Sequence, residues 1–192
     1  KLGAATFYKY FEAFGFTEKT GIDLPGEASP VYHSLKNLRV TELASTSFGQ
    51  SFRISPIQLI TAACAIANGG KLMQPYIVSK MLDEDGNVIK ENKPVVKRQV
   101  VSENTAEVLI DMMREVVNNG TGLSGYVAGY RVAGKTGTSD VLGPTGATGE
   151  YIASFAGCAP ANDPEISIII VVNEPQGQTG GGAVAAPVAA EV

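Results

Sequence analysis

The residues best suited to chemistry lie in one short stretch, GYRVAGKTGTS, from Gly129 to Ser139. From Gly129 to Thr136 it fits the pattern G-x-x-x-x-G-K-[ST], in which backbone N–H groups and a lysine surround nucleotide phosphates. From Lys135 to Thr138 the same letters spell Lys-Thr-Gly-Thr, which on a strand would present an ammonium and two hydroxyls to an anion. The two chemistries need different backbones, because a phosphate cradle opens a helix.

The residues around the lysine favour a strand. Those from Gly137 to Asp140 are poor helix formers, and bulky residues at 130–132 stand where a phosphate loop needs close backbone approach. A nucleotide hydrolase also needs an aspartate after an apolar strand to hold magnesium, whereas the most apolar run here ends in Asn173. We therefore predict an extended edge strand from Gly129 to Thr138 and keep a P-loop hydrolase as the disfavoured alternative.

On such an edge strand, Lys-Thr-Gly-Thr would make a donor-rich anion site. Gly137 has no side chain, so an extended ligand can approach the backbone, and the Thr138 N–H can serve as an oxyanion donor. The hydroxyls of Thr136 and Thr138 are expected to hold a terminal carboxylate, with Lys135 supplying fixed positive charge. Alone, the triplet is weak evidence, because three common residues recur by chance.

A second glycine pattern is misleading. GTGLSG, from Gly120 to Gly125, matches the dinucleotide motif G-x-G-x-x-G. It follows a predicted helix and precedes a predicted strand, which is the reverse of the order that a dinucleotide-binding fold requires. We interpret it as a connector.

Composition narrows the classes of function. The 192 residues are 44% hydrophobic and 18% charged, which is typical of one globular domain or a large piece of one. A net charge of −4 without a basic run argues against nucleic acid as a partner. No apolar run approaches the roughly 20 residues of a membrane span, so we expect no membrane segment in this chain.

The histidine and cysteine residues do not predict a metal or cofactor site. His33, the only histidine, has no Cys or other His at ligand spacing, so we expect no metal and assign it no role. Cys64 and Cys158 each lie in apolar segments and are expected to be buried thiols. We expect no cofactor.

Helices and strands can be placed from periodicity. Residues 1–16 are predicted to be helical from their aromatic spacing. Ser55, Pro56 and Gln58 predict a capped helix that ends at 68–70, with one apolar stripe made of Ile57, Ile60, Cys64 and Ala67. A third helix is expected from Ser102 to about Asn118, with Ala106, Leu109, Ile110, Met113 and Val117 on one face.

Strands are expected in the remaining apolar segments. Asp85-Gly86 predicts a hairpin over residues 75–92. Three further strands are expected at 130–138, 151–158 and 166–173, and the last, apolar on both faces, should be central and covered. The segment 183–192 should begin another helix, and both ends of the chain look cut, so we expect a fragment of a larger folded protein.

In this context the chain resembles the last part of class B penicillin-binding proteins. The similar segments, in order, are SFGQSFRISPIQLITAACAIANGGKLMQPYIV, GYRVAGKTGTS, YIASFAGCAPA, ISIIIVVNEP and GGAVAAPV. The resemblance implies an α+β fold, an antiparallel sheet flanked by helices, with residues 1–192 forming the C-terminal portion of a transpeptidase domain. It further implies partners outside the cytoplasmic membrane: the D-alanyl-D-alanine ends of peptidoglycan stem peptides, and β-lactams.

The resemblance also assigns residues. It gives catalytic roles to Lys135 and Thr138, with the Thr138 N–H as oxyanion donor, and substrate contacts to Thr136, Gly137 and Thr138. Ser139 and Asp140 follow immediately and are expected to border the cleft. The SFGQ segment at 47–50 is expected either to approach the site or to form only a turn at the entry of a helix, and the glycine-rich residues 141–150 are expected to form a loop that moves over the site.

Two catalytic motifs of the family are missing from this chain. The family's nucleophile is the serine of Ser-x-x-Lys, and no Ser-x-x-Lys occurs in the 192 residues. The one Ser-x-Asn string, Ser102-Glu103-Asn104, lies after the segment that the second motif should precede, so we interpret Ser102 as a helix cap. We expect the chain to hold one of three catalytic elements and to be inactive alone, its nucleophile lying in a missing N-terminal part of the same domain.

Relatives with the same Lys-Thr-Gly chemistry stay open as alternatives. A β-lactamase or a D,D-carboxypeptidase would use water where a transpeptidase uses an amine, and a β-lactam sensor would acylate and signal. The upstream segment favours the transpeptidase. The resemblance places the parent protein on the extracytoplasmic face of the membrane, anchored by a segment outside this chain.

Overall fold

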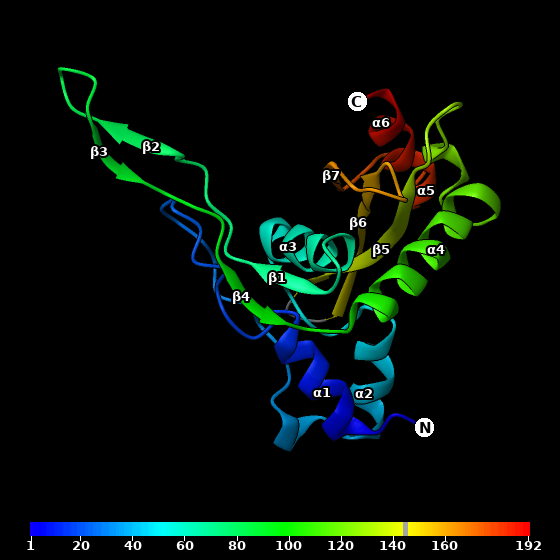
Figure 1. Ribbon diagram of the computed structural model, residues 1–192. Helices are drawn as coiled ribbons and strands as arrows, with labels where there is room; N and C mark the ends of the chain where they lie inside the picture. Colours follow the sequence, from blue (N-terminus) through cyan, green and yellow to red (C-terminus); the bar gives the residue numbers. More distant parts are fainter. Residues whose placement is uncertain (144–145) are drawn as a thin grey trace.

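The computed structural model describes residues 1–143 and 146–192. Its centre is an antiparallel sheet in the order β5-β6-β7, formed by Ala133–Gly143, Gly146–Ala159 and Ile166–Asn173. Helix α3, Pro56–Ala67, lies against β6 and β7, and the short helices α5, Gly181–Val184, and α6, Ala186–Glu191, pack against the sheet as well (Figure 1). The predicted α+β class, an antiparallel sheet flanked by helices, is confirmed.

The two faces of the sheet carry different cores. One core joins Phe155 of β6 to Val117, Ala185 and Ala186 on the helices. The other joins Ala133 and Cys158 of the sheet to Ile110 and Ala161, with side chains of α3 packed around them. Helix α4, Glu103–Asn119, contributes to both cores and therefore runs across the β5 end of the sheet (Figure 1). Burial raises the pKa of Cys158 to about 11, with a further contribution from Cys64.

The capping signals of α3 and α4 act as the sequence predicts. The Ser55 side chain accepts from the Gln58 N–H while the Gln58 side chain accepts from the Ser55 N–H, which completes a capping box. Ser102 caps α4 by accepting from the Thr105 N–H, so its interpretation as a cap is confirmed. On α4, Ala106, Ile110 and Val117 are buried, as the predicted stripe requires.

Between α3 and α4 the chain forms a long β-ribbon, which contains two separate antiparallel strand pairs. Strand β1, Lys71–Met73, pairs with β4, Val96–Gln99, beside α3. Farther out, β2, Lys80–Leu82, pairs with β3, Val88–Glu91, which confirms the predicted hairpin. This outer hairpin is exposed along its length and projects from the body (Figure 1). The β1–β4 pair had not been predicted.

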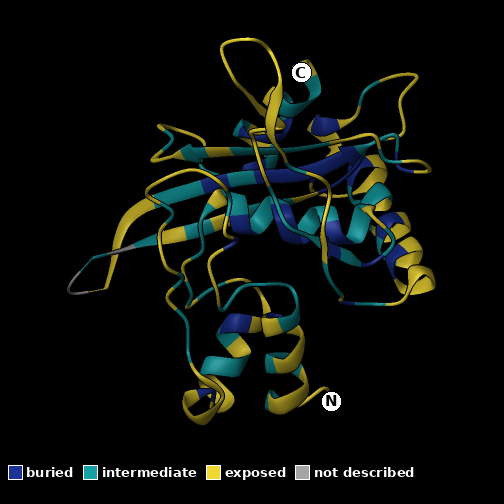
Figure 2. Cartoon of the chain, turned by 60° about the vertical axis from the view of Figure 1, so that its left-hand side comes forward, coloured by how far each residue is buried: buried dark blue, intermediate teal, exposed yellow. Residues whose placement is uncertain are grey.

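The N-terminal quarter forms a separate layer. Helix α1, Ala4–Ala13, the 3-10 helix η1, Leu35–Asn37, and helix α2, Val40–Ser47, lie together at one end of the molecule, away from the sheet (Figure 2). Phe11 is buried, and its ring contacts those of Phe7, Phe16, Tyr32 and Phe52. The aromatic spacing thus predicted α1 correctly, whereas α2 carries no signal that was recognised.

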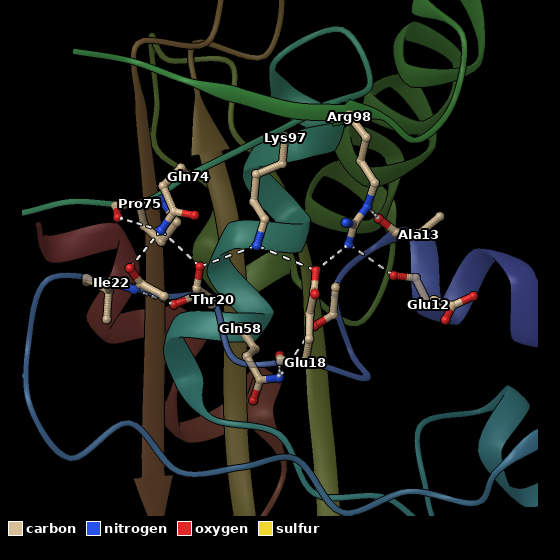
Figure 3. Close-up of polar contacts among 12 residues, drawn as sticks. Glu12, Ala13, Glu18, Thr20, Ile22, Gln58, Gln74, Pro75, Lys97 and Arg98 are labelled. Atoms are coloured by element: carbon tan, nitrogen blue, oxygen red, sulfur yellow. Dashed lines mark hydrogen bonds and ion pairs between the residues drawn. The ribbon is translucent and has the colours of Figure 1, made fainter. Parts of the chain in front are cut away.

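A polar network fastens this layer to the ribbon and α3 (Figure 3). Arg98 donates to Glu18 Oε1 at 2.9 Å and to the Ala13 carbonyl at 2.8 Å, and the hydrogen bond from Arg98 holds the pKa of Glu18 below its usual value. Gln58, almost fully buried, donates to the Glu18 carbonyl at 2.8 Å. Gln74 donates to the Thr20 carbonyl at 2.9 Å. The network thereby fixes the start of α3.

The apolar stripe predicted for α3 does lie on one face of the helix, but this is not the face that is most buried. Its members, Ile57, Ile60, Cys64 and Ala67, are only half-buried and line an open hollow of about 410 Å³. The buried residues are Gln58, Thr61, Ala62 and Ala65. The reason is physical: the buried glutamine donates to loop carbonyls, and the small Ala65 side chain lets α3 lie close to Leu72 and Val100.

Two further expectations need correction. Strand β7 is an edge of the described sheet, not central, because it pairs with β6 alone among the described residues. Its apolar character arises because α3 and α6 both contact it. The loop expected at 141–150 consists of the ends of β5 and β6, apart from residues 144–145, which lie outside the described residues.

We expect Gln58→Met to lower the free energy of unfolding by about 2 kcal/mol, because the buried Gln58 side chain donates to the part-buried Gly15 and Glu18 carbonyls and completes the capping box. Urea unfolding followed by circular dichroism measures the change. The exposed Gln178→Met is the matched control and should shift the midpoint little. Equal midpoints for the two variants would mean that the Gln58 network contributes nothing to stability.

Candidate anion site on the edge of β5

The site residues predicted from Lys135 to Asp140 all lie on β5, which begins at Ala133 and not at Gly129 as expected. Lys135 pairs with Ala156 and Thr138 with Ala153, and among the described residues β5 has no partner on its other side. Lys135 is thus in the middle of an edge strand. The edge strand is confirmed over this part, and the phosphate cradle is excluded because it needs a helix N-terminus.

Alternation along β5 separates the side chains onto two faces. Thr136 lies opposite Phe155, whose ring belongs to the core with Ala185 and Ala186, so the threonine side chains share the α5–α6 face. Lys135, Gly137 and Ser139 share the opposite face. The lysine and the hydroxyls therefore flank the open edge from two sides.

The free edge of β5 presents backbone groups of Thr136 and Thr138. The Gln50 side-chain amide donates to the Thr138 carbonyl at 3.4 Å, and the Lys135 ammonium donates to the Thr136 carbonyl at 2.6 Å. Neither donor comes from β6, so both carbonyls point away from the sheet. In a strand the N–H and C=O of one residue point to the same side, so the Thr138 N–H also faces the open edge.

Gln50 reaches this edge because the chain after α2 turns sharply. Gly49 has φ 93° and Ser51 has φ 65°, a left-handed conformation that non-glycine residues seldom adopt. The turn is held by the Gln50 N–H, which donates to the Ser45 carbonyl at 3.1 Å, and by the Ser51 hydroxyl, which donates to Ser45 Oγ at 2.9 Å. The expectation that SFGQ approaches the β5 strand is confirmed at Gln50.

Gly137 occupies the tightest point of the strand. A Cβ at this position would lie 2.5 Å from Ser154 Oγ on the neighbouring strand. From the other face, Gly181 at the start of α5 lies so close that its own Cβ would collide with the backbone of Gly137 and Ser154. The space expected to admit a ligand at Gly137 is thus also required by Ser154, which sequence reasoning missed.

The two threonine hydroxyls have protein partners on the helical side. The Gly181 N–H donates to Thr138 Oγ1 at 3.1 Å. Thr136 Oγ1 lies 2.9 Å from Thr121 Oγ1, and either hydroxyl can be the donor. Gly181 and Thr121 had not been predicted as part of the site. For Gly181, the run of three glycines at 180–182 was the sequence feature that could have indicated a close backbone approach.

The rim of the site is exposed. Lys135, Thr138 and Asp140 are exposed, and Ser139 is half-buried with its hydroxyl donating to the Asp140 carbonyl at 3.3 Å. Within residues 1–143 and 146–192, no cluster of carboxylate, histidine or cysteine side chains could hold a metal. Nor is any helix of the described chain long and apolar enough to cross a bilayer. The strand edge therefore offers an ammonium, hydroxyls and an N–H group.

This arrangement matches known proteins over the whole chain. Residues 1–192 fit the family model of the penicillin binding protein transpeptidase domain. The chain belongs to the penicillin-binding protein transpeptidase family. The resemblance inferred from the Lys-Thr-Gly strand and its neighbouring segments is confirmed.

Relatives and solved structures agree with this assignment. The chain is 40% identical to stage V sporulation protein D of Bacillus subtilis, covering 100% of this chain and 30% of that protein. It is 34% identical to the peptidoglycan D,D-transpeptidase FtsI of Escherichia coli, covering 93% of this chain and 29% of that protein. The structure of penicillin-binding protein 3 from Mycobacterium tuberculosis superposes with a TM-score of 0.90 at 31% identity, covering 98% of this chain and 45% of that one. The chain thus spans less than a third of these curated relatives.

The contact between Gly137 and Ser154 can be tested by a double-mutant cycle. We expect Gly137→Ala to lower the free energy of unfolding by about 1–3 kcal/mol through overpacking. Ser154→Ala removes the oxygen that the new Cβ would meet, so in the double variant the penalty should shrink by at least about 1 kcal/mol. Urea unfolding of the four proteins measures the coupling. Strict additivity would show that the two positions do not press on each other.

Proposed function

We propose that residues 1–192 are the C-terminal portion of the transpeptidase domain of a class B penicillin-binding protein. The parent protein would crosslink peptidoglycan stem peptides through an acyl-serine intermediate and bind penicillin. The observation that carries this proposal is the open edge of β5, where Lys135, Thr136 and the Thr138 N–H converge. Family membership and the similarity to a peptidoglycan D,D-transpeptidase support it.

The residues of β5 are proposed to bind and polarise the substrate. The carboxylate of a D-alanyl-D-alanine end, or of a β-lactam, is held by the hydroxyls of Thr136 and Thr138 and attracted by Lys135. The Thr138 N–H donates to the oxyanion that forms at the attacked carbonyl. The ligand backbone passes Gly137, and Ser139 and Asp140 border the cleft.

The remaining chemistry is proposed to come from outside this chain. A serine of the same domain attacks the carbonyl and forms an acyl-enzyme, expelling D-alanine or opening the β-lactam ring. An amine from a second stem peptide then attacks the acyl-serine and releases the crosslinked peptide. These substrates lie outside the cytoplasmic membrane, so the parent protein is proposed to act there, anchored by a segment outside residues 1–192.

Lys135→Ala in the parent protein should slow acylation by penicillin about a hundredfold, because one preorganised electrostatic contact is worth about 3 kcal/mol in the transition state. Stopped-flow acylation with a fluorescent penicillin measures the rate. Lys93→Ala removes an exposed lysine from the ribbon and serves as the control. Unchanged kinetics in Lys135→Ala would remove this lysine from the mechanism.

The isolated chain of 192 residues should not be acylated by a β-lactam. It contains no Ser-x-x-Lys, and a serine without an activating base is a weak nucleophile at neutral pH. Incubation with a fluorescent penicillin, followed by a denaturing gel and intact mass measurement, tests this. A stoichiometric adduct on a serine would show that the nucleophile lies within the chain.

A further inference from the structure

The GTGLSG segment, whose letters match the dinucleotide motif, places the Thr121 hydroxyl beside the anion site. The N–H groups of Gly120 and Gly122 both donate to the Val116 carbonyl, at 3.1 and 3.0 Å, and so close the C-terminal end of α4. A Cβ on either glycine would lie 2.9–3.2 Å from that same carbonyl oxygen. Between them, Thr121 is held with its hydroxyl 2.9 Å from Thr136 Oγ1.

Helix α5 holds Thr121 from the other side. A Cβ on Gly182 would collide with the Thr121 carbonyl oxygen, so only a residue without a side chain fits there. The next residue back, Gly181, donates its N–H to Thr138 Oγ1 at 3.1 Å. The start of α5 therefore fixes both Thr121 and the Thr138 hydroxyl relative to β5.

Hydrogen-bond capacity then decides what the site can recognise. A threonine hydroxyl has one proton to donate and two lone pairs to accept with. Thr138 Oγ1 accepts from Gly181, so its proton remains available for a ligand. Thr136 and Thr121 share one hydrogen bond, and the Thr136 proton is available only when Thr121 is the donor.

We propose that Thr121 is a positioning residue, which donates its hydroxyl proton to Thr136 Oγ1 when a ligand is bound. The protons of Thr136 and Thr138 then both point at one anionic group that only accepts hydrogen bonds, such as a carboxylate. A neutral ester at the same place accepts more weakly and gains less from this alignment. The inference rests on the proposed function, because it takes the β5 edge to be the carboxylate site.

The test uses the full-length protein with benzylpenicillin and with its methyl ester, which lacks the negative charge. Thr121→Val keeps the shape of the side chain and removes the hydroxyl. We expect Thr121→Val to slow acylation by benzylpenicillin about tenfold, because the Thr136 hydroxyl is no longer oriented to donate to the carboxylate. The slower acylation by the methyl ester should change less than about twofold. Thr121→Ser restores the hydroxyl and should restore the rate with benzylpenicillin.

Each other outcome overturns the proposal. Equal losses with both ligands would give Thr121 a structural role only, and thermal unfolding would show the accompanying destabilisation. An unchanged rate in Thr121→Val, or no recovery in Thr121→Ser, would separate the hydroxyl from ligand binding. A wild-type protein that neither ligand acylates would overturn the proposed function itself, and the inference with it.

Discussion

The close crossing of β5, β6 and α5 at Gly137 is the constraint on which the site depends. Ser154 fills the space beside Gly137 on one face, and Gly181 touches the same backbone on the other. Because no side chain intervenes, the first N–H of α5 reaches Thr138 and the next residue reaches Thr121. Larger residues here would push α5 outward, and the orientation of both threonine hydroxyls would be lost.

Local signals in the sequence were sufficient for much of the fold. Capping at Ser55 and Ser102 and the Asp85-Gly86 turn depend on residues a few positions apart, so they are legible without knowing the tertiary structure. The Lys-Thr-Gly-Thr strand was also predicted, because its propensity and its neighbours agreed. Its start was placed four residues early, since Tyr130, Arg131 and Val132 have side chains typical of strands, whereas the chain still turns at Gly129 and Tyr130.

What could not be predicted depends on contacts between distant segments. The buried face of α3 is set by Gln58, whose side-chain amide donates to the Gly15 and Glu18 carbonyls, 40 or more residues away. Gln50 and Thr121 contact β5 through turns whose geometry is not predicted by any motif that was recognised. The edge position of β7 likewise depends on which strands lie beside it. The sequence therefore identified the chemical groups of the site, but not the residues that orient them.

The crowding at Gly137 also limits how this surface can evolve. A side chain at Gly181 would meet backbone atoms of Gly137 and Ser154, so α5 would have to shift, whereas a side chain at Gly137 meets the Ser154 hydroxyl and is relieved by a second change there. Single substitutions are accommodated more easily at the exposed rim, at positions such as Asp140, where a new side chain does not displace α5.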